Sequence, residues 1–365
     1  MKFEMPKYHH PDFDQDFLKD APNATLEEVK EDGISPRNYH ALSVYPEYFK
    51  VNDKWVLATQ SRMDTVCVVD DTPGEESVDI VEFRNLKKGD KVVIGRTEDA
   101  SEGIYVWTQG FLEEAAKSDT FAFRSGRSRE TAFSMDYDNL YEVLKHEKEN
   151  EGYVTVIIGS ALSLDDDSRK ALARLIENGY IQAIFCGTET AAFDLEKGIY
   201  DTSWGQEHFE VEQNTKRNLY ETINLARKYG STKALVESGK VKDGFVKAAI
   251  ENDVSLVISG TIRDRLGLPE TLNNVYEAQN VMRTHSRKTS TVIMLSAILF
   301  TIATGNMTPS YNEFDGEVRP VYMYTVDIQE FAVNKLSDRG TVTAVSMVTN
   351  TPVSYTHLRA HETPE

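Results

Sequence analysis

The stretch VTVIIGSALSLDDDSRKALARLIENGYIQAIFCG, residues 154–187, decides the fold of this chain. At its two ends, VTVIIG and QAIFCG are short apolar runs that each finish in a glycine. Between them, SLDDDSRKALARLIENG has apolar residues at helical spacing, an acidic start and a glycine stop. A strand, a helix and a second strand in this order predict a βαβ unit with two parallel strands.

The same alternation of strands and helices continues toward the C-terminus. Helices are predicted for 219–230, 241–253, 272–285 and 330–340, and strands for 255–260, 291–295, 321–327 and 343–348. The strands are continuously apolar, which is typical of a parallel sheet covered on both faces. We therefore expect an α/β fold, with a Rossmann-like domain over residues 136–352.

The region upstream has a different pattern. Residues 1–50 are polar and acidic, and we expect an irregular N-terminal segment with one short helix at TLEEVKED, residues 25–32. Over 51–135, short alternating segments separated by DDTPGEE, KKGDK and EDASEG predict a smaller β-rich, barrel-like domain. The amphipathic segment 137–152 predicts a helix that links the two domains.

The composition argues against partners such as nucleic acid and anionic membranes, and against a disulfide framework. The formal net charge of −19 argues against a nucleic-acid or anionic-membrane partner, because both need clustered Lys and Arg. Two cysteines in apolar stretches and no N-terminal apolar run predict a cytoplasmic protein without a disulfide framework. His9 and His10 stand beside acids, but no zinc motif occurs, so we predict no metal site. Residues 353–365, VSYTHLRAHETPE, lack any periodicity and are expected to be a non-native, adapter-derived tail.

Four glycine-containing turns are expected at the carboxyl edge of the sheet. They supply the candidate cofactor-binding residues Gly159 and Ser160, Gly187 and Thr188, Gly260 and Thr261, and Gly305 and Asn306. Glycine lets the backbone approach a ligand closely, and the helix N-termini that follow favour an anion such as a pyrophosphate. Ordinary tight turns are the alternative, since GxGxxG is absent; the acids of 165–167 are best explained as a helix cap.

Acidic and basic side chains near these turns are candidates for the chemistry. Asp327 ends a predicted strand and is a candidate ligand of a ribose, or a helix cap. Arg263 and Asp264 follow a strand end and are catalytic candidates, one for a substrate carboxylate and one for a proton; a surface salt bridge is the alternative. Asp194 is the other catalytic candidate, or a cap, and Glu189 a weaker one.

Several strings together resemble one family. They are AIFCGTETAAFDLEKGIYDTSWG from residue 183, VISGTIRDRLGLPET from 257, EAQNVMR from 277, TIATGNMTPS from 301 and VDIQEFAVNKLSDRGT from 326, with a weaker match in DKWVLATQSRMD from 53. The chain resembles the LOR/SDH-region family, which includes the archaeal-type ornithine cyclodeaminases and the C-terminal part of arginine dihydrolase. The resemblance implies NAD as cofactor, an amino-acid substrate, conversion of ornithine to proline and ammonia, and a homo-oligomer.

This sequence departs from the family pattern at several polar positions. Thr188 replaces an Asn, Arg265 an acid, and Phe193 and Phe300 replace histidines. Histidine is the side chain best suited to proton transfer near neutral pH. One alternative is therefore a non-catalytic or repurposed NAD-binding protein. Another is aminoalkyl transfer of the deoxyhypusine-synthase kind, which needs a lysine such as Lys216 or Lys233.

Overall fold

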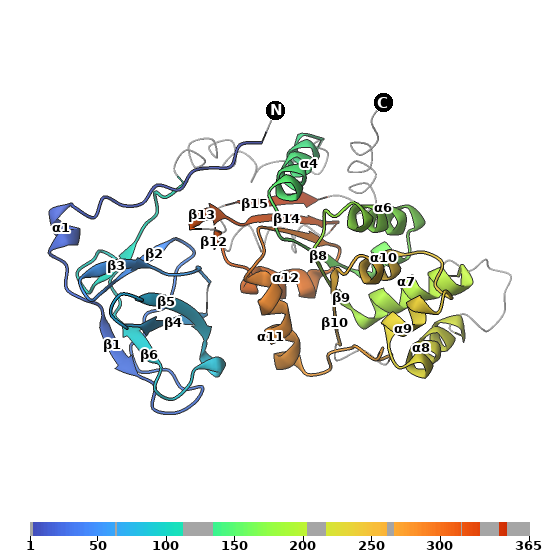
Figure 1. Cartoon of the computed structure of the whole chain (residues 1–365), viewed down its shortest axis with the longest axis horizontal. Helices are drawn as coiled ribbons and strands as arrows, with labels where there is room; N and C mark the ends of the chain where they lie inside the picture. The colour runs from blue at the N-terminus through green and yellow to red at the C-terminus, as the bar shows by residue number, and fades with distance from the viewer. Residues whose placement is uncertain are drawn as a thin grey trace.

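The computed structural model describes residues 3–62, 64–111, 134–202, 217–260, 266–314, 316–328 and 343–348. A β-rich part lies at one end of the molecule and an α/β part at the other (Figure 1). Within the described ranges, no helix is long and apolar enough to cross a bilayer.

The β-rich part consists of two small antiparallel sheets. One has the strand order β1-β6-β4-β5, from Thr25–Glu28, Lys91–Ile94, Thr65–Asp70 and Ser77–Glu82, and the other the order β3-β2-β7, from Lys54–Leu57, Glu47–Val51 and Ile104–Val106. Both sheets contribute to one apolar core that includes Phe49, Cys67 and Ile104. Short helices α1 (Asp16–Lys19) and η1 (Phe83–Asn85) complete this part.

The helix expected over residues 25–32 is wrong. Thr25–Glu28 is strand β1, which pairs antiparallel with β6 from Thr25 opposite Ile94 to Glu28 opposite Lys91. The short segment has little helix preference of its own, and the free edge of β6 determines its conformation. Together with β2, this strand places regular structure inside the N-terminal 50 residues that were expected to be irregular.

A parallel six-stranded sheet forms the α/β part. Its strands are β8 (Val154–Ile158), β9 (Ala183–Gly187), β10 (Ser255–Ser259), β11 (Thr291–Leu295), β14 (Tyr322–Asp327) and β15 (Ala344–Val348). In space they follow the order β10-β9-β8-β11-β14-β15, with every pair parallel. This is the 3-2-1-4-5-6 order of a doubly wound fold, so the predicted α/β class is confirmed.

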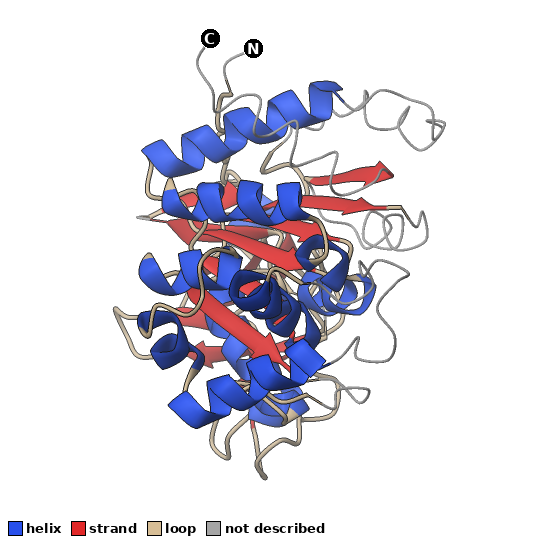
Figure 2. Ribbon diagram, turned by 90° about the vertical axis from the view of Figure 1, so that its right-hand side faces the viewer, coloured by secondary structure: helices blue, strands red, loops and turns tan. Residues whose placement is uncertain are grey.

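Helices cover both faces of this sheet (Figure 2). One face carries α4 (Ser134–Glu149), α6 (Asp166–Glu177), α7 (Thr188–Tyr200), α8 (Arg217–Tyr229), α9 (Thr232–Glu237) and α10 (Phe245–Glu251), and the other α11 (Val275–Ser286) and α12 (Ile298–Met307). Side chains alternate along each strand: Val156 and Ile158 face the first set of helices, and Ile157 faces α11 and α12.

Helix α12 contradicts one expectation about the site. Residues 298–307, which include the expected glycine loop, form a helix that ends at Met307. A glycine inside a helix costs only about 1 kcal/mol relative to alanine. Met307 is buried in the core against the sheet, which contributes about 1.5–3 kcal/mol and exceeds that cost, so the glycine does not end the helix.

A hairpin joins the two parts of the molecule. Strands β12 (Tyr311–Phe314) and β13 (Glu317–Pro320) leave the α/β part after α12 and reach the β-rich part. The Tyr311 hydroxyl donates to the Ala58 carbonyl oxygen at 2.9 Å, and Asn312 forms a β-bridge with Gln60. The hairpin therefore fixes how the β-rich part is attached to the sheet.

Candidate functional site

The switch point of the sheet lies between β8 and β11, where the strand order reverses. In open α/β sheets, ligands bind outside the carboxyl ends of the strands at this point. Gly159 follows β8 here, and its amide donates to the Leu295 carbonyl oxygen at 2.9 Å. The carbonyl oxygen of Ser296 occupies the position that a Cβ atom on Gly159 would take. Only a glycine allows the two strand ends to approach this closely.

Within the described ranges, three helices begin at this edge without a side-chain cap. They are α5 (Ser160–Ser163), α7 and α12, whose N-cap residues are Gly159, Gly187 and Ala297. By contrast, Asp165, Ser231 and Asn274 cap α6, α9 and α11 through side-chain oxygens. The first amides of a helix need an acceptor, so the uncapped termini of α5, α7 and α12 leave donors available to an anionic ligand.

Gly187 and Thr188 are placed at this edge as expected. Among the described residues, a Cβ atom on Gly187 would meet only the Phe300 ring, at 3.8 Å, so the backbone is open toward that ring. The Thr188 side chain is buried and its hydroxyl lies 3.3 Å from the hydroxyl of Thr271. The end of β9 therefore offers a half-buried glycine backbone beside an apolar side chain.

Gly260 is less open than Gly187. Its amide donates to the Leu272 carbonyl oxygen at 2.9 Å, and a Cβ atom on it would stand 3.0 Å from Oδ1 of Asn273. The segment before α11 therefore closes over the end of β10. Thr261, Arg263 and Asp264, which follow, lie outside the described residues, as does Lys216.

Asp327 ends β14, which is hydrogen-bonded to β11 and so lies beside the switch point. Its side chain is buried. The structure thus brings Asp327 to the same edge as Gly159 and Gly187, as the sequence predicted.

Gly305 and Asn306 are not brought to this edge, which corrects the expectation that they follow a strand end. Helix α12 starts after β11, and Ser310 beyond its end accepts from the Val321 amide, just before β14 begins. The helix therefore runs back toward the amino edge, and the pair lies in its last turn. Oδ1 of Asn306 is buried there and has no hydrogen-bond partner in the described part of the chain.

Asp194 lies inside the layer of helices. It is 0% exposed, its Oδ1 accepts from Nε of Arg169 at 2.7 Å, and its Oδ2 accepts from the Val246 amide at 2.9 Å. Burial raises the pKa of Asp194, and the Arg169 guanidinium opposes that rise. The side chain caps α10 and joins it to α6, so the structure does not bring Asp194 to the strand ends.

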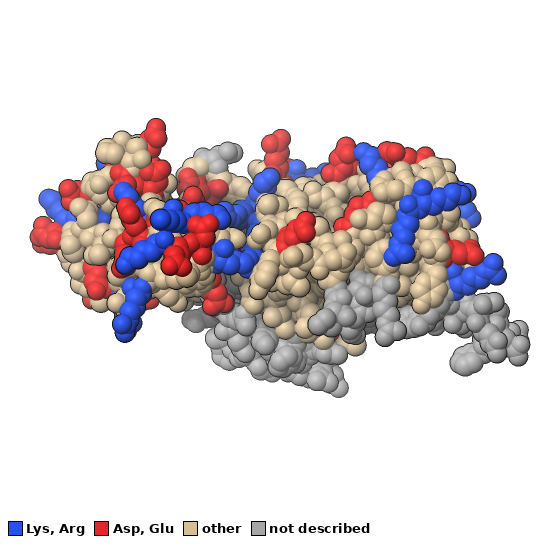
Figure 3. Space-filling model, turned by 90° about the horizontal axis from the view of Figure 1, so that it is seen from below, with Lys and Arg blue, Asp and Glu red and all other residues tan. Residues whose placement is uncertain are grey.

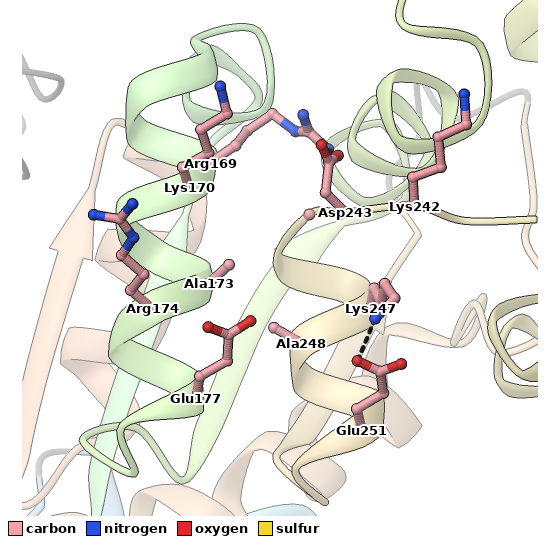
Figure 4. Close-up of a pocket in the computed structure, with 11 residues that line it drawn as sticks. Arg169, Lys170, Ala173, Arg174, Glu177, Lys242, Asp243, Lys247, Ala248 and Glu251 are labelled. Atoms are coloured by element: carbon pink, nitrogen blue, oxygen red, sulfur yellow. Dashed lines mark hydrogen bonds and ion pairs between the residues drawn. The ribbon is translucent and has the colours of Figure 1, made fainter. Parts of the chain in front are cut away.

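Arg169 also lines a surface groove of about 190 Å³ between α6 and α10 (Figure 4). Lys170, Lys242 and Asp243 lie near one end of the groove, and Glu177 and Glu251 near the other. Arg169 donates to Asp243 at 3.0 Å. The groove lies between two helices, and none of the glycines at the strand ends lines it.

Other sequence candidates have ordinary surroundings. Glu189 is exposed in the first turn of α7, and Lys233 on α9 lies 4.0 Å from Glu237. Sequence reasoning missed Ser296, because it placed the ligand turn at residue 303, and it singled out Phe300 only as the replacement of a histidine. The small residues that directly follow the apolar run 291–295 were the signal for the true strand end.

Two family models match the chain. The one for the Rossmann fold of the C-terminal region of ArgZ-like arginine dihydrolases covers residues 138–358, and the one for the first part of that region covers 46–131. The chain is 32% identical to an ornithine cyclodeaminase of Methanococcus maripaludis, over 92% of this chain and 78% of that protein.

Solved structures of similar proteins support the same family relationship. A LOR/SDH protein of Methanococcus maripaludis S2 superposes with a TM-score of 0.77 at 30% identity, over 93% of this chain and 96% of that one. AgrE, solved in a ternary complex with ornithine and NAD+, superposes with a TM-score of 0.58 at 28% identity, over 93% of this chain and 46% of that one. The chain thus spans about half the length of this bifunctional relative. It belongs to the family of archaeal ornithine cyclodeaminases and ArgZ-like C-terminal regions.

Proposed function

We propose that this chain is an NAD-dependent enzyme of the ornithine cyclodeaminase kind, which converts ornithine or a related amino acid to a cyclic product and ammonia. The observation that carries the proposal is the switch point, where Gly159 meets Ser296 in a chain of this family. AgrE, a relative of known structure, binds ornithine and NAD+.

The residues at the carboxyl edge fit a dinucleotide. Gly159 and Ser160 with Gly187 and Thr188 present uncapped helix amides, which suit the phosphates of NAD. In our proposal Asp327, at the carboxyl end of β14, accepts hydrogen bonds from hydroxyls of a ribose. When bound, NAD supplies a reversible acceptor for the hydride from the substrate Cα, so it is regenerated in each turnover.

The chain itself must hold the substrate and move its protons. In our proposal Arg263 binds the substrate carboxylate through its planar fork, and Asp264 accepts a proton from the α-amino group. Both follow the Gly260 strand end. Asp194 is not part of the proposed site, because Arg169 and the start of α10 occupy its carboxylate.

A second candidate function rests on Phe300. Its ring faces the open backbone of Gly187, at a position where the family resemblance implies a histidine. An apolar ring cannot transfer a proton, so the chain would then bind NAD without cyclising ornithine. This alternative predicts bound cofactor and no turnover.

One experiment separates these functions. In the first assay, the purified chain is denatured and the supernatant is analysed for NAD by absorbance and mass spectrometry. In the second assay, native protein is incubated with ornithine, and the formation of ammonia and proline is followed. NAD together with proline supports the enzyme. NAD without proline, on ornithine and on a panel of related amines, supports the second candidate. A chain that neither contains nor binds NAD would rule out both.

The proposal also includes a cytoplasmic location and a homo-oligomeric assembly. Both cysteines of the sequence are buried and unpaired, as is usual for a protein of a reducing compartment. Light scattering of the purified chain tests the assembly.

A further inference from the structure

Arginine side chains gather where the β-rich part contacts helix α11. We call them, with one acid, the arginine cluster: Arg62, Arg84, Arg283, Arg287 and Glu82. Arg62 and Arg287 both donate to the Ile80 carbonyl oxygen, at 3.2 and 2.8 Å. Basic and acidic side chains stand side by side on the underside of the β-rich end (Figure 3).

Glu82 is the acid that pairs with this cluster in the described part of the chain. Its carboxylate contacts Nη1 of Arg62 and lies 2.7 Å from Nε of Arg283. Its second oxygen accepts from Asn85 at 2.9 Å. Glu82 thus pairs with two of the four guanidinium groups of the cluster, whose five side chains carry a net charge of about +3 in a chain whose total is −19.

Several donors of the cluster are buried without a partner. Arg62 is 3% exposed and the Arg283 side chain 14%. Nε of Arg62, Nε of Arg84 and Nη1 of Arg283 make no hydrogen bond in the described part of the chain. Native proteins rarely leave buried guanidinium donors unsatisfied, so these atoms point to a group that the protein itself does not supply.

The positive charge of the arginine cluster also exceeds the negative charge beside it. Burial lowers the pKa of Arg283 to about 10, Glu82 opposes this, and neighbouring arginines such as Arg84 add to it. A water molecule would accept hydrogen bonds from these donors but would leave the positive charge uncompensated. An anion satisfies both needs at once.

We propose that the arginine cluster binds a small multivalent oxyanion carrying a phosphate group, which ties the β-rich part to α11. Guanidinium groups match the oxygens of a phosphate through paired hydrogen bonds. Arg283 lies in the last turn of α11, the end that leads to the amino end of β11. The site is therefore distinct from the carboxyl edge, and the inference does not depend on the proposed function.

A purely structural cluster is the competing explanation, in which Glu82 alone balances the arginines and no ligand binds. The two explanations differ in what Glu82→Gln does. If an anion binds, the loss of one negative charge raises phosphate affinity, and phosphate restores the stability that the substitution removes. If Glu82 is the sole counterion, the same variant is destabilised equally in phosphate and in chloride.

The test uses the full chain and inorganic phosphate as the probe. Calorimetric titration gives the Kd, and melting curves compare sodium phosphate with sodium chloride at equal ionic strength. Glycerol phosphate is titrated in parallel, to distinguish free phosphate from a phosphate group on an organic molecule. Arg84→Gln removes a partly exposed member of the cluster, and Arg96→Gln, an exposed arginine outside it, is the matched control.

We expect Arg84→Gln to weaken phosphate binding about tenfold and Glu82→Gln to tighten it by about the same factor, each about 1.4 kcal/mol. Arg96→Gln should bind like the unaltered chain. Binding of glycerol phosphate alone would assign the site to an organic phosphate. The inference is overturned if neither probe binds beyond the effect of chloride, or if Arg84→Gln and Arg96→Gln respond alike.

Discussion

The Ser296 carbonyl oxygen and the Cα of Gly159 are in direct contact across the switch point, with no room for a side chain between them. We expect Gly159→Ala to push the ends of β8 and β11 apart. The substitution should lower the free energy of unfolding by about 1–3 kcal/mol or more and abolish NAD retention. Chemical denaturation and the NAD content of the purified protein measure the two effects.

Gly187→Ala tests whether the turn after β9 belongs to the cofactor site. Its new methyl group would meet only Phe300, at ordinary contact distance, so the fold should tolerate it with a loss of less than about 1 kcal/mol. The methyl group would nevertheless cover backbone that the proposed ligand approaches. We expect nearly unchanged melting and at least a tenfold weaker NAD affinity, measured by fluorescence titration. Unchanged affinity would mean that this turn is not part of the cofactor site.

Asp327→Asn should alter the preference between cofactors. A carboxylate on the ribose hydroxyls favours NAD and repels the extra phosphate of NADP. Loss of the charge should weaken NAD binding by about 1.5–3 kcal/mol and improve NADP binding relative to it. Titration with both cofactors measures the ratio, and equal losses for the two would contradict the role given to Asp327.

Asp194→Asn decides whether this buried acid acts in structure or in catalysis. The substitution leaves the Arg169 guanidinium buried without its main counterion, so we expect a loss of about 3–5 kcal/mol in the free energy of unfolding. Turnover per folded molecule should be unchanged. Asp243→Asn is the matched control, since Asp243 pairs with the same arginine but its side chain is 56% exposed; it should cost less than about 1 kcal/mol.

Phe300→His tests whether the apolar ring beside Gly187 limits turnover. If so, the variant should raise proline formation from ornithine by about tenfold or more, since general acid–base groups contribute factors of about 100–10,000. Phe193→His is the control for a histidine that cannot reach the site. Phe193 is buried in the core of the helix layer, so this variant should mainly lower the free energy of unfolding, by about 2–4 kcal/mol. Steady-state assays and melting curves separate the two.

Cys67 and Cys186 should resist thiol reagents in the native state. Burial raises the pKa of both thiols, and the reactive species is the thiolate. At pH 8 their labelling should follow the unfolding rate, and both should react rapidly in denaturant. Fast labelling of the folded chain would contradict the burial of these side chains.

Local pattern was sufficient to predict most of the α/β part. The apolar runs that became β8, β9 and β11 are recognisable because burial on both faces demands uninterrupted apolar sequence. The cap at Asp165 was also predicted from local sequence. Its side chain accepts a hydrogen bond from the amide of Ser168, which is only three residues away.

Long-range contacts explain what the sequence did not reveal. Arg169 and Val246, the partners of Asp194, lie 25 and 52 residues away, and no local pattern links them to it. The conformation of Gly305 was likewise decided by packing of its helix on the sheet rather than by its own preference. These are the places where tertiary contacts outweigh local propensity.

The hairpin between α12 and β14 has a consequence for synthesis. The hydrogen bond from Tyr311 to Ala58 spans 253 residues, so the β-rich part leaves the ribosome long before its partner exists. At about 5–20 residues per second, roughly 13–50 s pass between the synthesis of Ala58 and that of Tyr311. During this interval the surface of the β-rich part around Ala58 is exposed, and a nascent chain stalled before residue 311 would be a natural client of chaperones.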